Sequence, residues 1–405
     1  MLSANVVNRI VAMASNMIIS RLLSADGYGL LSYIFNIYGY INLAEGFGLL
    51  LGTLQYGTEN SLKNRQYPFF KYGIKKGNAV NTGILCVVIL ASFFVELPIK
   101  GANFLIRIYT PIIFIEYTMT ILMNMLRCQD DIVGYSRSLN LNTVLNAIGT
   151  CVGAIWGIIG VIIGKYLAYT FTLLILCIYG RDNLRKVISS DDINTTEKKE
   201  LWRYSLITGV TSALNCMLYL VDVSMVGNII RQADEVGIYK IATLIPNALV
   251  FVPNSIVISV LPQIIIHQND KQWLRNKLKK LYLGMGITNL SIAVVVVLMS
   301  KIIIRILAGS GYEGASRILQ ILIVGFSIEG TFKILTSNVL AALKRVKYNF
   351  IISIITIIFD VIFNIIFIKR FQIYGAAYAT LLTELIVSIV SFIYAYYVVF
   401  RMEKN

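Results

Sequence analysis

Glu329 and Lys333 stand four residues apart in an apolar stretch, a spacing that brings two side chains together on one face of a helix. They can form a structural ion pair, or an anionic ligand can compete with Glu329 for the ammonium group of Lys333. Arg9 lies in another apolar stretch and has no evident carboxylate near it in sequence. Because a guanidinium group can bind two phosphate oxygens at once, we predict that Arg9 and Lys333 contact an anionic group.

Three carboxylates in the second half of the chain also lie in apolar stretches, namely Asp222, Asp360 and Glu384. No obvious cation lies near them in sequence. Carboxylates at membrane depth are typical of proton and ion pathways. We therefore predict that these three residues bind a proton or a sodium ion and couple its movement to a conformational change.

Polar side chains recur every four residues along one apolar segment, at Ser138, Asn142, Asn146 and Thr150. Residues at this spacing share one helix face, and such a stripe offers hydrogen bonds to a sugar. We predict that Asn142 and Asn146 bind substrate in this way. The alternative is that polar stripes join neighbouring helices through interhelical hydrogen bonds, and both interpretations stay open.

Ionisable residues inside apolar segments are numerous. Each costs roughly 2.5–3.5 kcal/mol at the bilayer centre on insertion scales, so we predict that they line a water-filled cavity. The set comprises Arg9, Glu45, Glu116, Lys165, Asp222, Lys240, Glu329, Lys333, Asp360 and Glu384. Glu45 and Glu116 can neutralise Arg9 or Lys165, whereas Lys165 and Lys240 are expected to extend toward the membrane interface.

Motifs for catalysis are missing from the sequence. It has no Gly-rich phosphate loop followed by Lys-Ser/Thr, no cluster of metal-ligand residues and no nucleophile motif. His267 is the single histidine, and the five cysteines have no paired spacing. We therefore expect that the protein is not an enzyme, needs no cofactor or metal, and does not use ATP by itself.

The elements that must position these residues follow from composition. Of the 405 residues 57% are hydrophobic and only 14% are charged, whereas soluble domains average roughly 45–50% and about 25%. A spanning helix needs about 20 apolar residues, so we predict an all-α integral membrane protein with about twelve transmembrane helices. The predicted spans are 4–21, 30–55, 77–97, 104–127, 138–157, 160–180, 204–229, 237–262, 282–305, 314–341, 348–368 and 374–399.

The distribution of Lys and Arg predicts the orientation. Most of the 36 basic residues fall in the loops that follow even-numbered spans, which indicates that these loops and both termini are cytoplasmic. The net charge of +15 then fits a basic membrane face that meets anionic lipid heads, without nucleic acid as a partner. The first apolar stretch lacks a basic leader and a small-residue cleavage site, so we expect a retained span.

An internal repeat divides the chain. The segment Ala25-Asp26-Gly27-Tyr28-Gly29 is matched by Ala233-Asp234-Glu235-Val236-Gly237, and each opens a span that follows another span. This repeat predicts an N-terminal six-helix half at 1–180, a cytoplasmic linker at 181–203 and a C-terminal six-helix half at 204–405. Halves with an even number of spans are parallel in topology, and we expect a central cavity between them.

The segment Ser20-Arg21-Leu22-Leu23-Ser24-Ala25-Asp26-Gly27-Tyr28-Gly29-Leu30 resembles the first-loop signature of Wzx-type polysaccharide flippases. The segment Ala233-Asp234-Glu235-Val236-Gly237-Ile238-Tyr239 resembles the signature of their second half. Residues 311–320 and 374–380 fit later parts of the same pattern. These families belong to the superfamily of multidrug, oligosaccharidyl-lipid and polysaccharide exporters, and the resemblance covers essentially the whole chain.

The resemblance implies a function that composition alone does not. It implies a flippase in the bacterial inner membrane that moves an O-antigen or capsular repeat unit on undecaprenyl diphosphate to the periplasmic leaflet by alternating access. It also implies partners among other membrane proteins of polysaccharide assembly. Two alternatives remain: a cation-coupled drug exporter of the same superfamily, and an integral membrane glycan polymerase or ligase. The short predicted outer loops weigh against a polymerase.

Overall fold

The computed structural model describes residues 2–61, 65–267, 270–343 and 346–397, and every regular element in these ranges is a helix. Each predicted span overlaps a helix or a run of consecutive helices. Nine helices or helix runs in this part of the chain are long and apolar enough to cross a membrane. The predicted cytoplasmic ends, Met1 and residues 398–405, lie outside the described residues, as do parts of the basic loops at 62–64 and 344–345.

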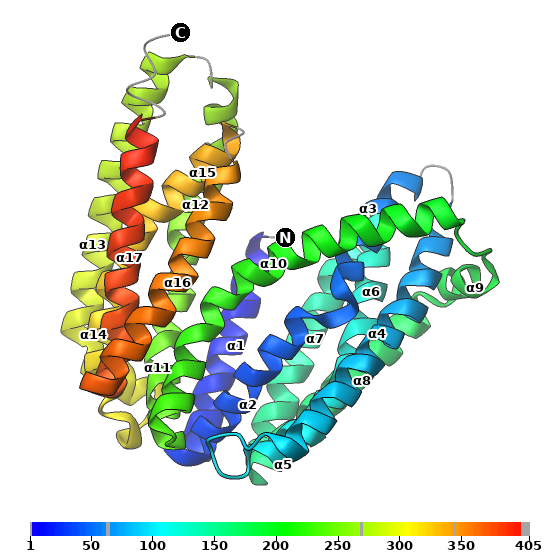
Figure 1. Cartoon of the computed structure of the whole chain (residues 1–405), viewed down its shortest axis with the longest axis horizontal. Helices are drawn as coiled ribbons and strands as arrows, with labels where there is room; N and C mark the ends of the chain where they lie inside the picture. Colours follow the sequence, from blue (N-terminus) through cyan, green and yellow to red (C-terminus); the bar gives the residue numbers. More distant parts are fainter. Residues whose placement is uncertain (1, 62–64, 268–269, 344–345, 398–405) are drawn as a thin grey trace. The chain divides into compact units, whose positions relative to one another are not determined.

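The chain forms two compact units, residues 1–220 (unit 1) and 221–405 (unit 2). The boundary falls inside one helix, α10, which continues from unit 1 into unit 2 (Figure 1). The helices up to this boundary are α1 (Leu2–Leu22), α2 (Ala25–Leu43), η1 (Glu45–Gly48), α3 (Leu49–Ser61), α4 (Tyr67–Phe94), α5 (Ala102–Tyr109), η2 (Thr110–Ile112), α6 (Ile113–Cys128), α7 (Ile132–Ala154), α8 (Gly157–Tyr179), α9 (Arg181–Ser189) and α10 (Thr195–Ile230).

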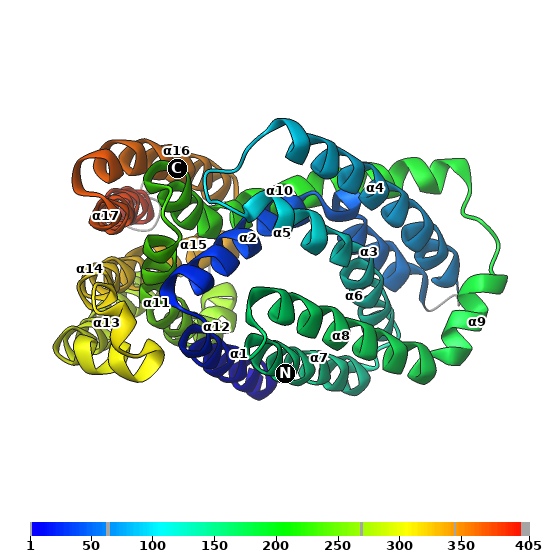
Figure 2. The same cartoon turned by 90° about the horizontal axis from the view of Figure 1, so that it is seen from below.

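Glycines allow α7 and α8 to pack closely in unit 1, where the two helices run side by side (Figure 2). A Cβ atom on Gly153 would collide with the backbone oxygen of Gly160, and one on Gly164 would collide with that of Gly149. Small residues at such crossings let two backbones approach, which is how membrane helices commonly gain packing energy. This pair of helices therefore depends on the absence of side chains at its crossing.

The predicted linker 181–203 contains α9 and the first turns of α10, and it packs onto unit 1. Ile193 and Leu201 are buried against Leu49 and Phe69 of α3 and α4. The Lys71 ammonium group donates to the backbone oxygen of Ser190. These contacts make the linker part of unit 1, which extends to residue 220.

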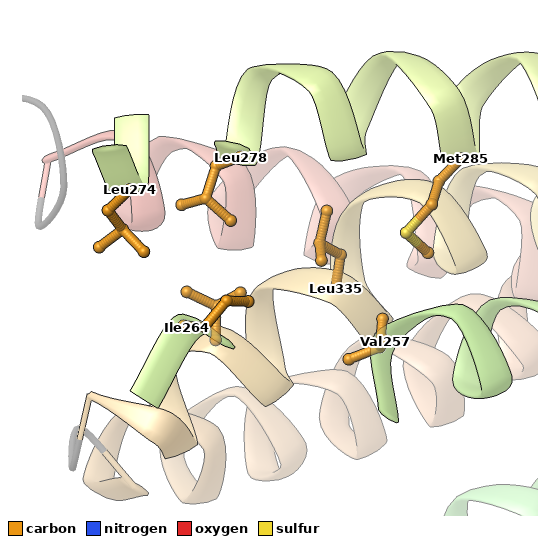
Figure 3. Close-up of a cluster of buried hydrophobic side chains, with 7 residues drawn as sticks. Val257, Ile264, Leu274, Leu278, Met285 and Leu335 are labelled. Atoms are coloured by element: carbon orange, nitrogen blue, oxygen red, sulfur yellow. The ribbon is translucent and has the colours of Figure 1, made fainter. Parts of the chain in front are cut away.

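The remaining helices are α11 (Ala233–Leu249), α12 (Phe251–Ile266), α13 (Lys271–Ala308), η3 (Ser310–Tyr312), α14 (Ala315–Ile328), the π-helical turn η4 (Glu329–Lys333), α15 (Ile334–Ala342), α16 (Val346–Phe371) and α17 (Ile373–Tyr396). The repeated segments found in the sequence occupy equivalent places, because Ala25 opens α2 and Ala233 opens α11. One apolar cluster of unit 2 joins α12, α13 and α15 (Figure 3). It includes Val257, Leu278 and Leu335, and it packs the α12 and α13 helices against the segment that carries η4.

Candidate functional site

Unit 2 gathers polar side chains of four helices around Asp222, a group we call the carboxylate cluster: Asp222, Tyr239, Asp360, Asn364 and Thr380. The amide of Asn364 donates to Asp222 Oδ1 at 2.9 Å. The hydroxyl groups of Thr380 and Tyr239 donate to Asp222 Oδ2 at 2.8 and 3.0 Å. The Asp360 carboxyl group also lies within hydrogen-bonding reach of Asp222. Four helices, α10, α11, α16 and α17, thus converge on one carboxylate.

The carboxylate cluster is rich in oxygen atoms, and three of its five residues are buried. Asp360 is 5% exposed, and Tyr239 and Asn364 are completely buried. The Asn364 Oδ1 atom has no hydrogen-bond partner. Within the described residues, no Lys or Arg forms an ion pair with Asp222 or Asp360. Two neighbouring carboxyl groups repel each other when both are ionised, so the arrangement suits a proton or a small hard cation held by oxygen ligands.

A second group, the lysine triad, comprises Glu329, Lys333 and Glu384. The Lys333 ammonium group lies 3.2 Å from Glu329 Oε1 and 2.9 Å from Glu384 Oε1. It also donates to Glu384 Oε2 at 3.0 Å. The three side chains are only 13–21% exposed. One ammonium group therefore faces two carboxylates, and the triad carries one excess negative charge when all three groups are ionised.

A π-helical turn positions the lysine triad. Glu329 begins η4 and Lys333 ends it, between α14 and α15. Single π-helical turns inside α-helices frequently mark functional sites. The turn lets Lys333 contact Glu329 within its own helix run and Glu384 on α17 at the same time.

Helix α17 connects the two groups. Thr380 belongs to the carboxylate cluster and Glu384, one turn later on the same face, belongs to the lysine triad. Glu384 is close enough to interact electrostatically with Asp222 and Asp360. A change of charge in one group therefore changes the electrostatic potential at the other. The three carboxylates predicted to carry ions are thus divided, since Asp222 and Asp360 share one group and Glu384 pairs with Lys333.

The candidate residues of unit 1 have different surroundings. Arg9 is exposed on α1. Asn142 on α7 accepts a hydrogen bond from Thr172 of α8 at 3.4 Å, and Thr150 contacts Ser15 of α1 at 3.2 Å. Parts of the α7 stripe thus join helices, in agreement with the alternative left open above. Asn146 lies between these contacts, and its backbone oxygen accepts from Thr150.

Sequence reasoning missed two partners of the site. Tyr239 lies in the repeated segment that opens α11, but nothing in its spacing pointed to Asp222. The pair of Lys333 with Glu384 joins residues 51 positions apart. The available signal was the four-residue spacing of Thr380 and Glu384, which places both on one helix face but identifies no partner.

Solved structures of transporters share this fold. An inward-facing multidrug resistance MATE family transporter of the MOP superfamily is 14% identical, with a TM-score of 0.76 over 98% of this chain and 96% of its own. The lipid II flippase MurJ in an inward closed conformation is 18% identical, with a TM-score of 0.77 over 97% and 86%. An outward-facing MATE transporter gives a TM-score of 0.58 at 14% identity over 100% and 95%. The prediction of an all-α integral membrane fold is confirmed, although twelve helices is an approximate number.

The sequence also matches a family model. The match covers residues 1–268, which is more than half of the chain, and the family is described as polysaccharide biosynthesis protein. No curated protein sequence matches significantly. The resemblance found in the sequence motifs is therefore confirmed at the level of the family. With its long apolar helices, this multi-pass membrane protein belongs to the polysaccharide biosynthesis protein family.

Proposed function

We propose that this protein is a flippase that moves a lipid-linked oligosaccharide from the cytoplasmic to the periplasmic leaflet of a bacterial inner membrane. The substrate would be an O-antigen or capsular repeat unit on undecaprenyl diphosphate. Family membership supports a role in polysaccharide biosynthesis. The observation that carries the proposal is the lysine triad, because an ammonium group at membrane depth, held by two carboxylates, is one that a diphosphate can engage.

In this proposal Lys333 exchanges partners. A diphosphate that approaches Lys333 competes with Glu329 and Glu384, and charge-assisted hydrogen bonds to phosphate replace those to carboxylate. Arg9 supplies a second cationic contact from the N-terminal half, residues 1–180, and Asn142 and Asn146 bind the sugar. The C-terminal half, residues 204–405, supplies Lys333 to the head group, while the polyprenyl tail stays in lipid. We also propose that residues 181–203 form a cytoplasmic linker between these two halves and that both termini are cytoplasmic.

The carboxylate cluster supplies the driving force in this proposal. A proton or sodium ion binds between Asp222 and Asp360, and its charge alters the field at Glu384, which holds Lys333. To move a two-state equilibrium from 1:99 to 99:1, differential affinity of about 5.5 kcal/mol is enough. An ion that binds one state more tightly than the other thus drives repeated transport in one direction.

Purified full-length protein in vesicles tests this proposal. The vesicles carry a fluorescently labelled undecaprenyl-diphosphate disaccharide, and a membrane-impermeant quencher reports how much label faces outward. The parental protein is expected to redistribute the label faster than protein-free vesicles, and an imposed sodium or proton gradient is expected to drive accumulation in one leaflet. Asp222→Asn and Asp360→Asn are expected to abolish the gradient-driven accumulation and to leave slow downhill exchange.

Asp234→Asn is a matched control, because Asp234 is exposed at the start of α11. It is expected to behave as the parental protein does. Redistribution no faster than in protein-free vesicles would show that the protein does not flip such a lipid. If Asp222→Asn, Asp360→Asn and Glu384→Gln each keep gradient-driven accumulation at the parental rate, the proposed ion coupling is wrong while flipping itself can still hold.

A second candidate is a cation-coupled drug exporter, which the similarity to a multidrug resistance MATE family transporter favours. The same vesicles separate the two functions. Gradient-driven uptake of a cationic dye, without movement of the labelled lipid, would assign the protein to drug export. Adding an acceptor saccharide lipid tests for a glycan polymerase, since longer products would reveal one.

A further inference from the structure

The second apolar span of unit 1 is broken at membrane depth. Between α2 and α3 the three residues Gly46, Phe47 and Gly48 have φ angles of 54°, 46° and 78°. A positive φ is rare for a bulky residue such as Phe and is sustained only where the surroundings enforce it. Here the Gly46 amide donates to the buried Asn81 Oδ1 of α4 at 2.9 Å. Broken helices at membrane depth are where transporters commonly coordinate ions.

Glu45 is the residue that enters this break. It is 9% exposed, and its Oε1 atom is buried without a hydrogen-bond partner. The Glu116 carboxylate of α6 lies close enough to repel it. A carboxylate in this position is costly unless a positive charge or a proton neutralises it.

Glu116 has a partner, but that partner is neutral. The Tyr38 hydroxyl of α2 donates to Glu116 Oε2 at 2.8 Å. The Tyr109 ring packs on Tyr38 with ring centroids 4.7 Å apart, and its hydroxyl is completely buried and has no hydrogen-bond partner. Tyr109 also interacts electrostatically with Glu116. An unsatisfied phenol oxygen close to the Glu116 carboxylate can serve as a further oxygen ligand for a cation.

Lys165 of α8 is a basic residue that interacts with this group, and aromatic rings pack around its ammonium group. Its ammonium group lies 4.3 Å from the ring centre of Phe35 and 5.3 Å from that of Tyr109. It interacts electrostatically with Glu116, yet among the described residues no ion pair within 4.0 Å joins Lys165 to Glu45 or Glu116. Lys165 therefore balances at most one of the two carboxylates, which leaves one negative charge uncompensated when both are ionised.

We propose that Glu45 and Glu116 form a monovalent-cation site at the break between α2 and α3, which takes one proton or one sodium ion. The titratable groups that face it come from four helices: Tyr38, Tyr109, Glu116, Tyr117, Lys165 and Tyr169. This site is additional to the carboxylate cluster of unit 2, and it does not depend on which substrate the protein moves. Each unit then holds its own cation.

Ion binding to the detergent-purified full chain tests the proposal. Bound ²²Na⁺ is counted by equilibrium dialysis, and the infrared band of a protonated carboxyl group is recorded at neutral pH without sodium. An Asp222→Asn/Asp360→Asn protein, which lacks the carboxylate cluster, is expected to keep one sodium ion or one protonated carboxyl. Adding Glu45→Gln is expected to remove it. Loss of the sodium ion identifies the ligand as sodium, and loss of the band alone identifies a proton.

Glu59→Gln is the matched control, because Glu59 is an exposed carboxylate on α3 that accepts a hydrogen bond from Gln55 of the same helix. It is expected to change neither readout. If Glu45→Gln does not fold, as judged by its thermal unfolding, Glu116→Gln takes its place. A folded variant that leaves both the sodium count and the carboxyl band unchanged overturns the site. Failure of lipid flipping, by contrast, leaves these binding readouts unaffected.

Discussion

At the scale of single residues, the lysine triad depends on the positive charge of Lys333. Its removal leaves the partly buried Glu329 and Glu384 without the cation that they share. Breaking a buried ion pair in this way costs roughly 3–5 kcal/mol, so Lys333→Gln is expected to lower the free energy of unfolding by that amount. Lys333→Arg keeps the charge and is expected to lose less. Denaturation in one detergent measures both, with the exposed Lys199→Gln as the control. A Lys333→Gln protein as stable as its parent would contradict the triad's structural role.

Substitution of Arg9 tests substrate binding without disturbing the fold. Arg9 is exposed on α1, so Arg9→Ala is expected to leave expression and thermal stability near parental. If Arg9 contacts the diphosphate, lipid flipping falls about tenfold or more, because a charge-assisted hydrogen bond contributes about 1.5–3 kcal/mol. Arg9→Lys is expected to retain part of the rate, since the charge survives without the planar fork. Parental flipping rates in Arg9→Ala would remove Arg9 from the binding site.

At the scale of elements, the crossing of α7 and α8 makes a prediction about glycine. A Cβ on Gly164 meets the backbone oxygen of Gly149, which cannot move as a side chain would. Gly164→Ala is therefore expected to lower the stability of unit 1 by about 1–3 kcal/mol, the usual cost of overpacking. Gly83→Ala is the control, because a Cβ there meets nothing within 4 Å, and in the α4 interior alanine is expected to add about 0.5–1 kcal/mol. Thermal unfolding measures the stability of both variants. A Gly164→Ala protein as stable as its parent would contradict the close packing of α7 and α8.

At the scale of the whole molecule, the bias of Lys and Arg predicts which loops face the cytoplasm. In a cysteine-free background, Asp192→Cys, in the exposed segment after α9, is expected to react with an impermeant thiol reagent only after the membrane is opened. Gly311→Cys, exposed in η3, is expected to react in intact cells. Both positions are accessible in the structure, so a difference in labelling reports orientation. The reverse pattern would contradict a chain with both ends inside.

The sequence predicts the helices of this molecule better than the contacts between them. In lipid, each helix must satisfy its backbone within its own segment, so hydropathy and length were enough to place the spans. The pair Glu329–Lys333 could be foreseen for the same reason, since it lies within one turn. The pair Lys333–Glu384 and the approach of Tyr239 to Asp222 depend on the rotation and stagger of separate helices. The break at residues 45–48 could not be predicted either, because no local sequence pattern indicates that Phe47 adopts a left-handed backbone conformation.

The π-helical turn at Glu329–Lys333 determines what the deletion of a single codon there would do to the protein. Such a turn holds one residue more than the α-helical turn it replaces, and each residue of an α-helix rotates the chain by about 100°. Deleting a single codon there would restore a regular helix with its apolar length intact. The residues that follow would then turn by about that angle relative to α14, and Lys333 would leave Glu384. Two descendants of one gene could thus keep the same spans and differ in whether Lys333 pairs with Glu384, separated by one three-nucleotide deletion.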